Sequence, residues 1–301
     1  MTKQILNNGK EIPNIGYGSI IVSMNTKNYF TILKSVAKKI LTFNFKSLRK
    51  EYMLYKIVKF AGRTSSKKIL IDTSRAYGAS EYIIGKAIKK NREKYYIVTK
   101  LCNKDQEKGN IKEALQESLK QLGIKKVDLY LMHWPVTGKY LNSWKQMEEC
   151  YKEGLCDAIG VCNCNIHHLE DIKRIATVQP MVNQIECHPL FTQEKLREYC
   201  NTNNIKVMAY TATARMDERL KKTCLVKIAQ KYNKTIPAII LRWHIQIKNI
   251  PIFNTSKLKN YENNMDIFDF ELTQKEIEDI SKININSRLR YDPDNCDFSQ
   301  L

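Results

Sequence analysis

Short apolar runs alternate with segments of helical periodicity along most of the chain. The apolar runs have the length of buried strands and lie at 15–21, 68–73, 94–101, 127–134, 156–163, 180–187, 205–211 and 249–254. Apolar residues recur at helical spacing from Ile83 to Ile88 and near 111–122, 143–153, 167–175, 193–203, 224–232 and 236–247. Eight strands alternating with helices predict an α/β fold, a single (β/α)8 TIM barrel.

Two features stand outside this alternation. Residues 3–12 predict an N-terminal β-hairpin, with Asn8-Gly9 as its tight turn. Residues 25–62 are helical in pattern, and Gly62 is expected to end that stretch. Its apolar faces are too extensive for a solvated linker.

The composition favours a soluble protein with a sizeable core. The chain has 301 residues, of which 43% are hydrophobic, and no apolar run reaches the ~18 residues that a membrane span needs. The first ten residues lack the apolar core of a secretion signal, and the nine cysteines are irregularly spaced. We therefore expect a cytoplasmic protein with reduced thiols and no membrane insertion.

The net charge of +19 is unevenly distributed. Residues 25–68 contain twelve Lys and Arg residues against one acid, Glu51, and so carry eleven of the nineteen excess charges. A nucleic-acid-binding function would depend on this charge alone, and we expect no nucleic-acid partner. The basic excess belongs mainly to one segment.

Polar residues with acid–base chemistry follow three of the predicted strands. Asp72 ends one strand and Tyr77 lies five residues later, Lys100 ends the next strand, and His133 ends the third. Each has an ordinary structural explanation, such as a helix cap, a surface aromatic, a solvated charge or a core histidine. Because the carboxyl ends of barrel strands meet at one mouth, however, the four residues together predict a site there.

Several motifs resemble the aldo-keto reductase superfamily over nearly the whole chain. They are IDTSRAYGASEYIIGKAI, LYLMHWPV, DAIGVCN with HHLEDI, and VNQIECHPL, while the ending YDPDNCDF is similar to the microbial and protozoan branch related to diketogluconate reductases. The resemblance implies reduction of a small aldehyde or ketone to an alcohol by hydride transfer from NAD(P)H. It also identifies Asp72, Tyr77, Lys100 and His133 as the catalytic tetrad.

The chemistry is consistent with that tetrad. A tyrosine with an ordinary pKa of ~10 is a poor acid at neutral pH. A lysinium at Lys100 stabilises the phenolate and is expected to lower the pKa of Tyr77, while Asp72 fixes the lysine. Tyr77 is then the general acid, and His133 orients the carbonyl oxygen. Trp134 is expected to line the substrate pocket.

The resemblance also implies the cofactor contacts. Asn163 and Gln184 would hold the nicotinamide carboxamide, Tyr210 would stack on the ring, and Asn264 would reach the adenine. Cys162 stands where the family usually has serine. The alternative cofactor loop, Gly16-Tyr17-Gly18, lacks the third glycine and the following helix of a dinucleotide-binding fingerprint.

This chain departs from the family where the adenosine 2′-phosphate binds. The family's Pro-Lys-Ser and downstream Arg appear here as Phe253-Asn254-Thr255 and Asn260. NADPH is the expected cofactor, as in the family. NADH is an alternative, because losing a bidentate arginine removes a strong charge-assisted contact to the 2′-phosphate. Residues 211–214 likewise lack the family's Ser-Pro-Leu-Gly turn.

The stretch between the first two strands exceeds the family's length by roughly twenty residues. We interpret 47–61 as the ordinary first helix and 24–46 as a basic insertion in one domain, 1–301. Three interpretations are open: the segment packs on the barrel, it docks on an acidic partner or membrane surface, or it is noncoding sequence translated in error. With the altered clamp, it motivates a second hypothesis: a catalytically weak binding or regulatory subunit similar to the potassium-channel β subunits.

Three further expectations concern partners. We predict a small carbonyl substrate and a monomer. We also predict no metal site, because the spacing of Cys162 and Cys164 with His167 and His168 is only weakly metal-like. Arg75 is either a solvated side chain or a cation that attracts an acidic substrate.

Overall fold

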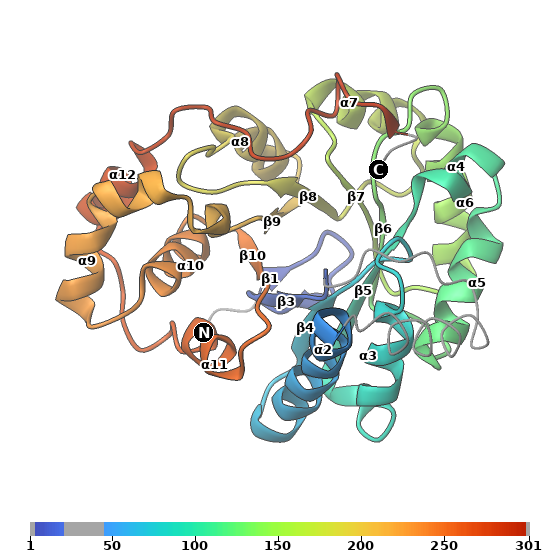
Figure 1. The fold of residues 1–301 in the computed structure, drawn as a ribbon. Coiled ribbons are helices and arrows are strands. Elements are labelled where there is room, and N and C mark those ends of the chain that lie inside the picture. The colour runs from blue at the N-terminus through green and yellow to red at the C-terminus, as the bar shows by residue number, and fades with distance from the viewer. Residues whose placement is uncertain (1–3, 21–44, 299–301) are drawn as a thin grey trace.

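Eight parallel strands close into a barrel in the order β10-β3-β4-β5-β6-β7-β8-β9 (Figure 1). The computed structural model describes residues 4–20 and 45–298. The barrel strands are β3 (Gly16–Gly18), β4 (Ile69–Asp72), β5 (Tyr95–Leu101), β6 (Leu129–Met132), β7 (Ile159–Cys162), β8 (Val182–Glu186), β9 (Lys206–Tyr210) and β10 (Ile250–Phe253). All eight predicted strands are present, so the predicted (β/α)8 barrel is confirmed.

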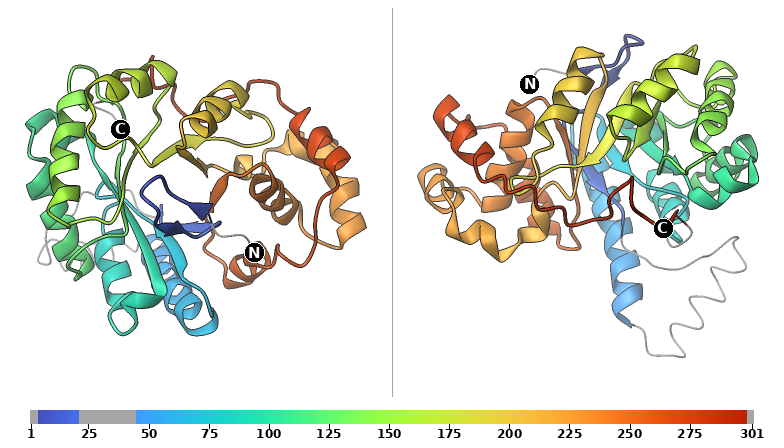
Figure 2. Two further views of the ribbon diagram at one scale, coloured as in Figure 1. Left: turned by 180° about the vertical axis from the view of Figure 1, so that it is seen from behind. Right: turned by 90° about the horizontal axis from the view of Figure 1, so that it is seen from above.

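Helices surround the barrel (Figures 1 and 2). They are α2 (Phe45–Thr64), α3 (Ser80–Ile88), α4 (Asn103–Lys108), α5 (Ile111–Leu122), α6 (Tyr140–Lys152), α7 (Ile166–Ile175), α8 (Glu194–Thr202), α9 (Leu225–Tyr232), α10 (Ile236–Gln246), α11 (Leu258–Met265) and α12 (Gln274–Ser281), with 3-10 turns η1 (Arg92–Lys94), η2 (Ala214–Met216) and η3 (Glu218–Lys222). Helices α4, α11 and α12 are absent from the prediction, because each contains too few apolar residues to show a clear apolar period.

The predicted hairpin, β1 (Gln4–Ile5) with β2 (Glu11–Ile12), is confirmed. Gly9 turns the chain at φ 81°, a left-handed conformation that glycine adopts without strain. Asn7 donates to the backbone oxygen of Pro180, and Asn8 donates to that of Asp157. Because these carbonyls precede β8 and β7, the hairpin lies at the amino-terminal end of the barrel and leaves the other end open.

Helix α2 continues past Gly62, so the predicted stop there is wrong. A side chain at Gly62 would overlap the Tyr95 phenol, which donates a 3.0 Å hydrogen bond to the Val58 carbonyl. The glycine therefore permits close packing of helix on strand rather than ending the helix. Helix α2 covers the predicted first helix, 47–61. Residues 21–44 lie outside the described residues, and the insertion at 24–46 stays a prediction.

The strand register places the candidate acid–base residues on one face. Asp72 pairs with Val98 in the ladder between β4 and β5, two residues before Lys100. Because side chains alternate along a strand, Val98 and Lys100 point the same way, and Lys100 reaches the level just beyond Asp72. The barrel interior thus ends in charged side chains at its open mouth.

Two expectations from composition bear on the fold. All nine cysteines are free, and six of them are buried. Within residues 4–20 and 45–298, no helix combines the length and apolar character needed to cross a bilayer.

Candidate active site

A buried ion pair forms the base of the site. Lys100 Nζ lies 2.7 Å from both carboxylate oxygens of Asp72 and donates a third hydrogen bond, of 2.8 Å, to the Thr73 carbonyl. All three ammonium donors therefore have partners, although the residue is fully buried. Burial alone lowers the pKa of Lys100, but the Asp72 carboxylate outweighs it and the pKa is raised above its ordinary value. Lys100 is accordingly a fixed positive charge.

Tyr77 lies over that charge. The turn after β4 brings it back toward the mouth, where Lys100 Nζ is 5.1 Å from the centroid of the phenol ring. Tyr77 Oη is 3.4 Å from His133 Nε2, and the two rings meet edge to face. The structure thus brings together all four residues that the sequence assigns to catalysis.

The electrostatics of Tyr77 differ from the expectation. Burial raises its pKa to about 12, and Lys100 opposes this shift without reversing it. The expected net lowering is therefore wrong for this structure, because desolvation of the phenolate exceeds its attraction to an ammonium already neutralised by Asp72. Burial, with Lys100 and Arg290, lowers the pKa of His133 to about 3. The imidazole is neutral and can donate a hydrogen bond.

Three residues predicted to hold the nicotinamide surround the same mouth. Asn163 donates a 3.0 Å bond to the His133 carbonyl and accepts a 2.7 Å bond from Tyr210 Oη. Gln184 donates a 2.9 Å bond to Asp72 Oδ1, and Cys162 Sγ donates to Gln184 Oε1 at 3.8 Å. Among the residues that the structure describes, each amide keeps one N–H and one lone pair free for a ligand.

A cavity of about 740 Å³ opens above these residues. Eight of the predicted site residues line it: Asp72, Tyr77, His133, Trp134, Asn163, Gln184, Tyr210 and Asn254. Lys100 and Cys162 lie behind this lining and contact it through hydrogen bonds. Thr255 and Asn264 are not among the lining residues, and Asn254 donates to the Gly18 and Ile20 carbonyls.

The cavity also has walls outside the predicted site residues. They are contributed by β10, by residues 211–215 after β9, and by Arg290 and Tyr291 near the C-terminus. Ala214, Arg215 and Met216 have φ values of 48–55°, a left-handed conformation that is costly for residues other than glycine. Apart from β10, these walls belong to irregular segments, which no periodicity marks and whose position depends on distant contacts.

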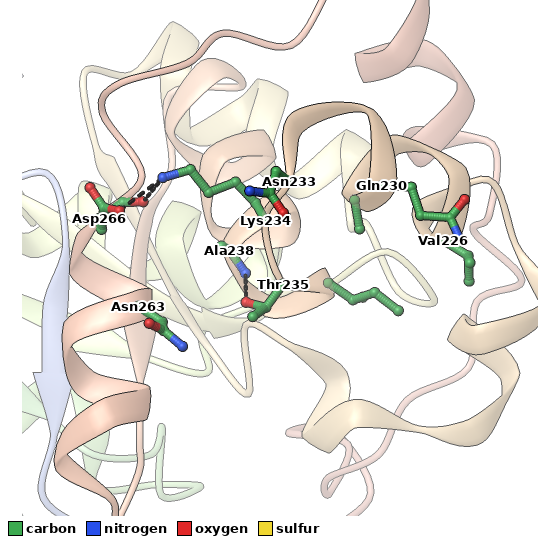
Figure 3. Close-up of a pocket in the computed structure, with 10 residues that line it drawn as sticks. Val226, Gln230, Asn233, Lys234, Thr235, Ala238, Asn263 and Asp266 are labelled. Carbon is green, nitrogen blue, oxygen red and sulfur yellow. Dashed lines mark hydrogen bonds and ion pairs between the residues drawn. The ribbon is translucent and has the colours of Figure 1, made fainter.

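A second, smaller hollow of about 550 Å³ lies outside the barrel, beside the turn between α9 and α10 (Figure 3). Lys234 reaches across it and pairs with Asp266 at 2.9 Å and Asp269 at 2.8 Å. Its charges are compensated, and it contains none of the acid–base residues. The larger cavity is therefore the candidate active site.

The weak metal motif separates in space. Cys162 and Cys164 are buried, whereas His167 and His168 lie close to Asp294. His168 Nδ1 accepts a 3.1 Å bond from the Asn165 N–H, so the neutral ring carries its proton on Nε2, the nitrogen that faces Asp294. A protonated nitrogen cannot ligate a metal, and this geometry favours a hydrogen-bonded cluster.

Fold and site together define a barrel enzyme with an acid–base centre at the carboxyl ends of its strands. Comparison with known proteins specifies the class further. The sequence profile of the aldo/keto reductase family matches residues 50–285. The chain therefore belongs to the aldo/keto reductase family, and it is an oxidoreductase that acts on carbonyl groups.

Individual relatives agree with this assignment. The chain is 38% identical over 231 residues to the glyoxal reductase of Bacillus subtilis, covering 76% of this chain and 83% of that protein. It is 39% identical over 230 residues to the methylglyoxal reductase DkgA of Escherichia coli, covering 74% and 82%. The structure of a Bombyx mori aldo-keto reductase in complex with NADP matches with a TM-score of 0.81 at 28% identity, covering 97% and 96%.

Proposed function

We propose that the protein reduces small aldehydes or ketones to alcohols, with Tyr77 as the general acid and a nicotinamide dinucleotide as the cofactor. The observation that carries this proposal is the buried Lys100–Asp72 pair beneath a tyrosine whose hydroxyl lies 3.4 Å from a neutral histidine. When bound, the reduced cofactor supplies a hydride to the carbonyl carbon.

The protein's own groups manage the oxygen of that carbonyl. His133 is neutral and donates a hydrogen bond from Nε2, which fixes the oxygen beside the Tyr77 hydroxyl. As negative charge develops on the oxygen, Tyr77 transfers its proton, and Lys100 stabilises the resulting phenolate. Trp134, which is 5% exposed and packs against Phe298, shields this end of the cavity from water.

The cavity fits a dinucleotide in two respects. Asn163 and Gln184 both line the cavity, and each amide has an N–H with no acceptor among the described residues, as recognition of a carboxamide requires. Arg215 lines the β9 side of the cavity with no side-chain partner among the described residues, so it is placed to meet a phosphate. Asn260 in place of the clamp arginine supports use of NADH as well as NADPH.

The named relatives narrow the substrate. Glyoxal and methylglyoxal reductases are similar to this chain over more than four-fifths of their length. We infer that short 2-oxoaldehydes are among the carbonyl compounds that this protein reduces.

The test is a fluorescence titration of the purified protein with NADPH and NADH, followed by turnover of methylglyoxal and 4-nitrobenzaldehyde. Expected results are binding of one or both dinucleotides and turnover that Tyr77→Phe reduces by about 10²- to 10⁴-fold without weakening dinucleotide binding. Full activity in Tyr77→Phe would contradict the general-acid role. Binding of neither dinucleotide would favour a regulatory subunit instead.

A further inference from the structure

The active-site cavity contains two positive charges that nothing in the described chain compensates. Its lining includes three charged side chains, Asp72, Arg215 and Arg290, and Lys100 already neutralises Asp72. Neither guanidinium makes a side-chain hydrogen bond or ion pair within residues 4–20 and 45–298. The cation that the sequence suggested for acidic substrates, Arg75, instead pairs with Asp105 at 2.8 Å and does not line the cavity.

Arg290 is placed by a segment that crosses the barrel. The C-terminal strap, residues 285–298, runs from the α12 side of the barrel to the α7 side (Figures 1 and 2). The buried carboxylate of Glu186, at the end of β8, accepts hydrogen bonds from the backbone N–H groups of Leu289, at 2.6 Å, and Arg290, at 3.0 Å. His188 Nε2 lies 3.0 Å from the same carboxylate. The backbone at Arg290 is therefore fixed, while its side chain has no partner in the described part of the chain.

The position of Arg290 relates it to the reacting end of the cavity. Burial and Lys100 lower the pKa of His133, on the β6 side, and the charge of Arg290 adds to that shift. Burial raises the pKa of Tyr210, at the end of β9, and the charge of Arg290 partly opposes that rise. Arg215 follows β9 on the side of the barrel away from His133. Both arginines line the cavity, and the charge of Arg290 acts on His133.

We propose that Arg290 binds a carboxylate on the substrate, so that oxo acids and aldehydes carrying a carboxylate are the preferred substrates. A guanidinium matches a carboxylate with two parallel hydrogen bonds, and an unpaired one in a cavity offers both. The neighbouring arginine does not have this freedom. Arg288 lies 4.5 Å from the centroid of the Phe191 ring and 4.0 Å from Asp292. This proposal rests on the proposed reductase function.

The experiment compares two aldehydes of nearly equal shape, 4-formylbenzoate and its neutral amide 4-formylbenzamide, in wild type and in Arg290→Gln. Loss of the guanidinium is expected to lower kcat/KM for 4-formylbenzoate by about 10- to 100-fold, mainly through KM, and to leave that for the amide within about threefold. Arg290→Lys should recover part of the loss, since it keeps the charge but not the fork. Arg288→Gln removes the same charge two residues away. It should leave the ratio of kcat/KM for 4-formylbenzoate to kcat/KM for 4-formylbenzamide unchanged.

The outcomes separate the two proposals. One outcome is that wild type turns over both aldehydes while Arg290→Gln shows the same ratio of the two kcat/KM values. That result supports the reductase function and overturns the role of Arg290. An equal loss for both substrates indicates a disturbed strap and also overturns it. Turnover of neither aldehyde by wild type, with either dinucleotide, overturns the reductase function and this inference with it.

Discussion

Lys100 and Asp72 form an ion pair whose side chains are 0% and 7% exposed, at the junction of β4 and β5. Breaking such a pair leaves one buried charge uncompensated, which costs about 3–5 kcal/mol. We expect Asp72→Asn and Lys100→Met each to lower the free energy of unfolding by roughly this amount. The double variant should lose much less than the sum. Urea denaturation of the four proteins gives the coupling, and additive losses would contradict the ion pair.

The pH dependence of reduction follows from the shifted pKa values of the site. His133, with a pKa near 3, stays neutral in mildly acidic solution, and Tyr77, with a pKa near 12, stays protonated in mildly alkaline solution. We therefore expect kcat/KM for reduction to show no inflection from either group between about pH 5 and 9. An ordinary histidine titrates near pH 6.5. An inflection there that disappears in His133→Gln would show that the imidazole is exposed to solvent.

His244 makes the fold sensitive to acid. It is fully buried, Nε2 donates to the Ala212 carbonyl and Nδ1 accepts from Asn249, and burial lowers its pKa to about 3. Between about pH 6.5 and 3 the unfolded chain binds the proton and the folded chain does not. Stability therefore falls as pH falls, by up to about 1.4 kcal/mol per unit for this group.

This dependence is measured by denaturation between pH 7 and 5. His133 and His168 have lowered pKa values and act in the same direction, so His244→Gln should reduce the slope without abolishing it. Equal slopes in wild type and His244→Gln would mean that His244 does not titrate on unfolding.

Cofactor preference can be tested on helix α11. Restoring the family's arginine with Asn260→Arg adds a charge-assisted contact to the 2′-phosphate, and we expect about 10- to 100-fold tighter NADPH with NADH changed by less than threefold. Asn263→Arg adds the same charge on the same helix but toward the outer hollow of Figure 3, and serves as the control. A similar gain in both variants would indicate a general effect of charge.

The sequence alone determined the barrel and which acid–base residues meet at its mouth. The periods of strands and helices are local properties of the chain. Eight successive strand–helix units are compatible with few topologies other than a barrel. The meeting of Asp72, Tyr77, Lys100 and His133 was also predictable, because parallel strands bring their carboxyl ends to one mouth. Asp72 and Lys100 meet because they lie on adjacent strands, along which side chains alternate with a period of two residues.

Other features depended on distances that no local pattern contains. The raised pKa of Tyr77 follows from burial in three dimensions, although the sequence correctly suggests that Lys100 opposes it. Gly62 looks like a helix stop until Tyr95 is packed against it. Arg290 reaches the site only because Glu186, more than a hundred residues earlier, holds the strap. Desolvation and charge pairing depend on which distant segments meet, and tertiary structure alone decides that.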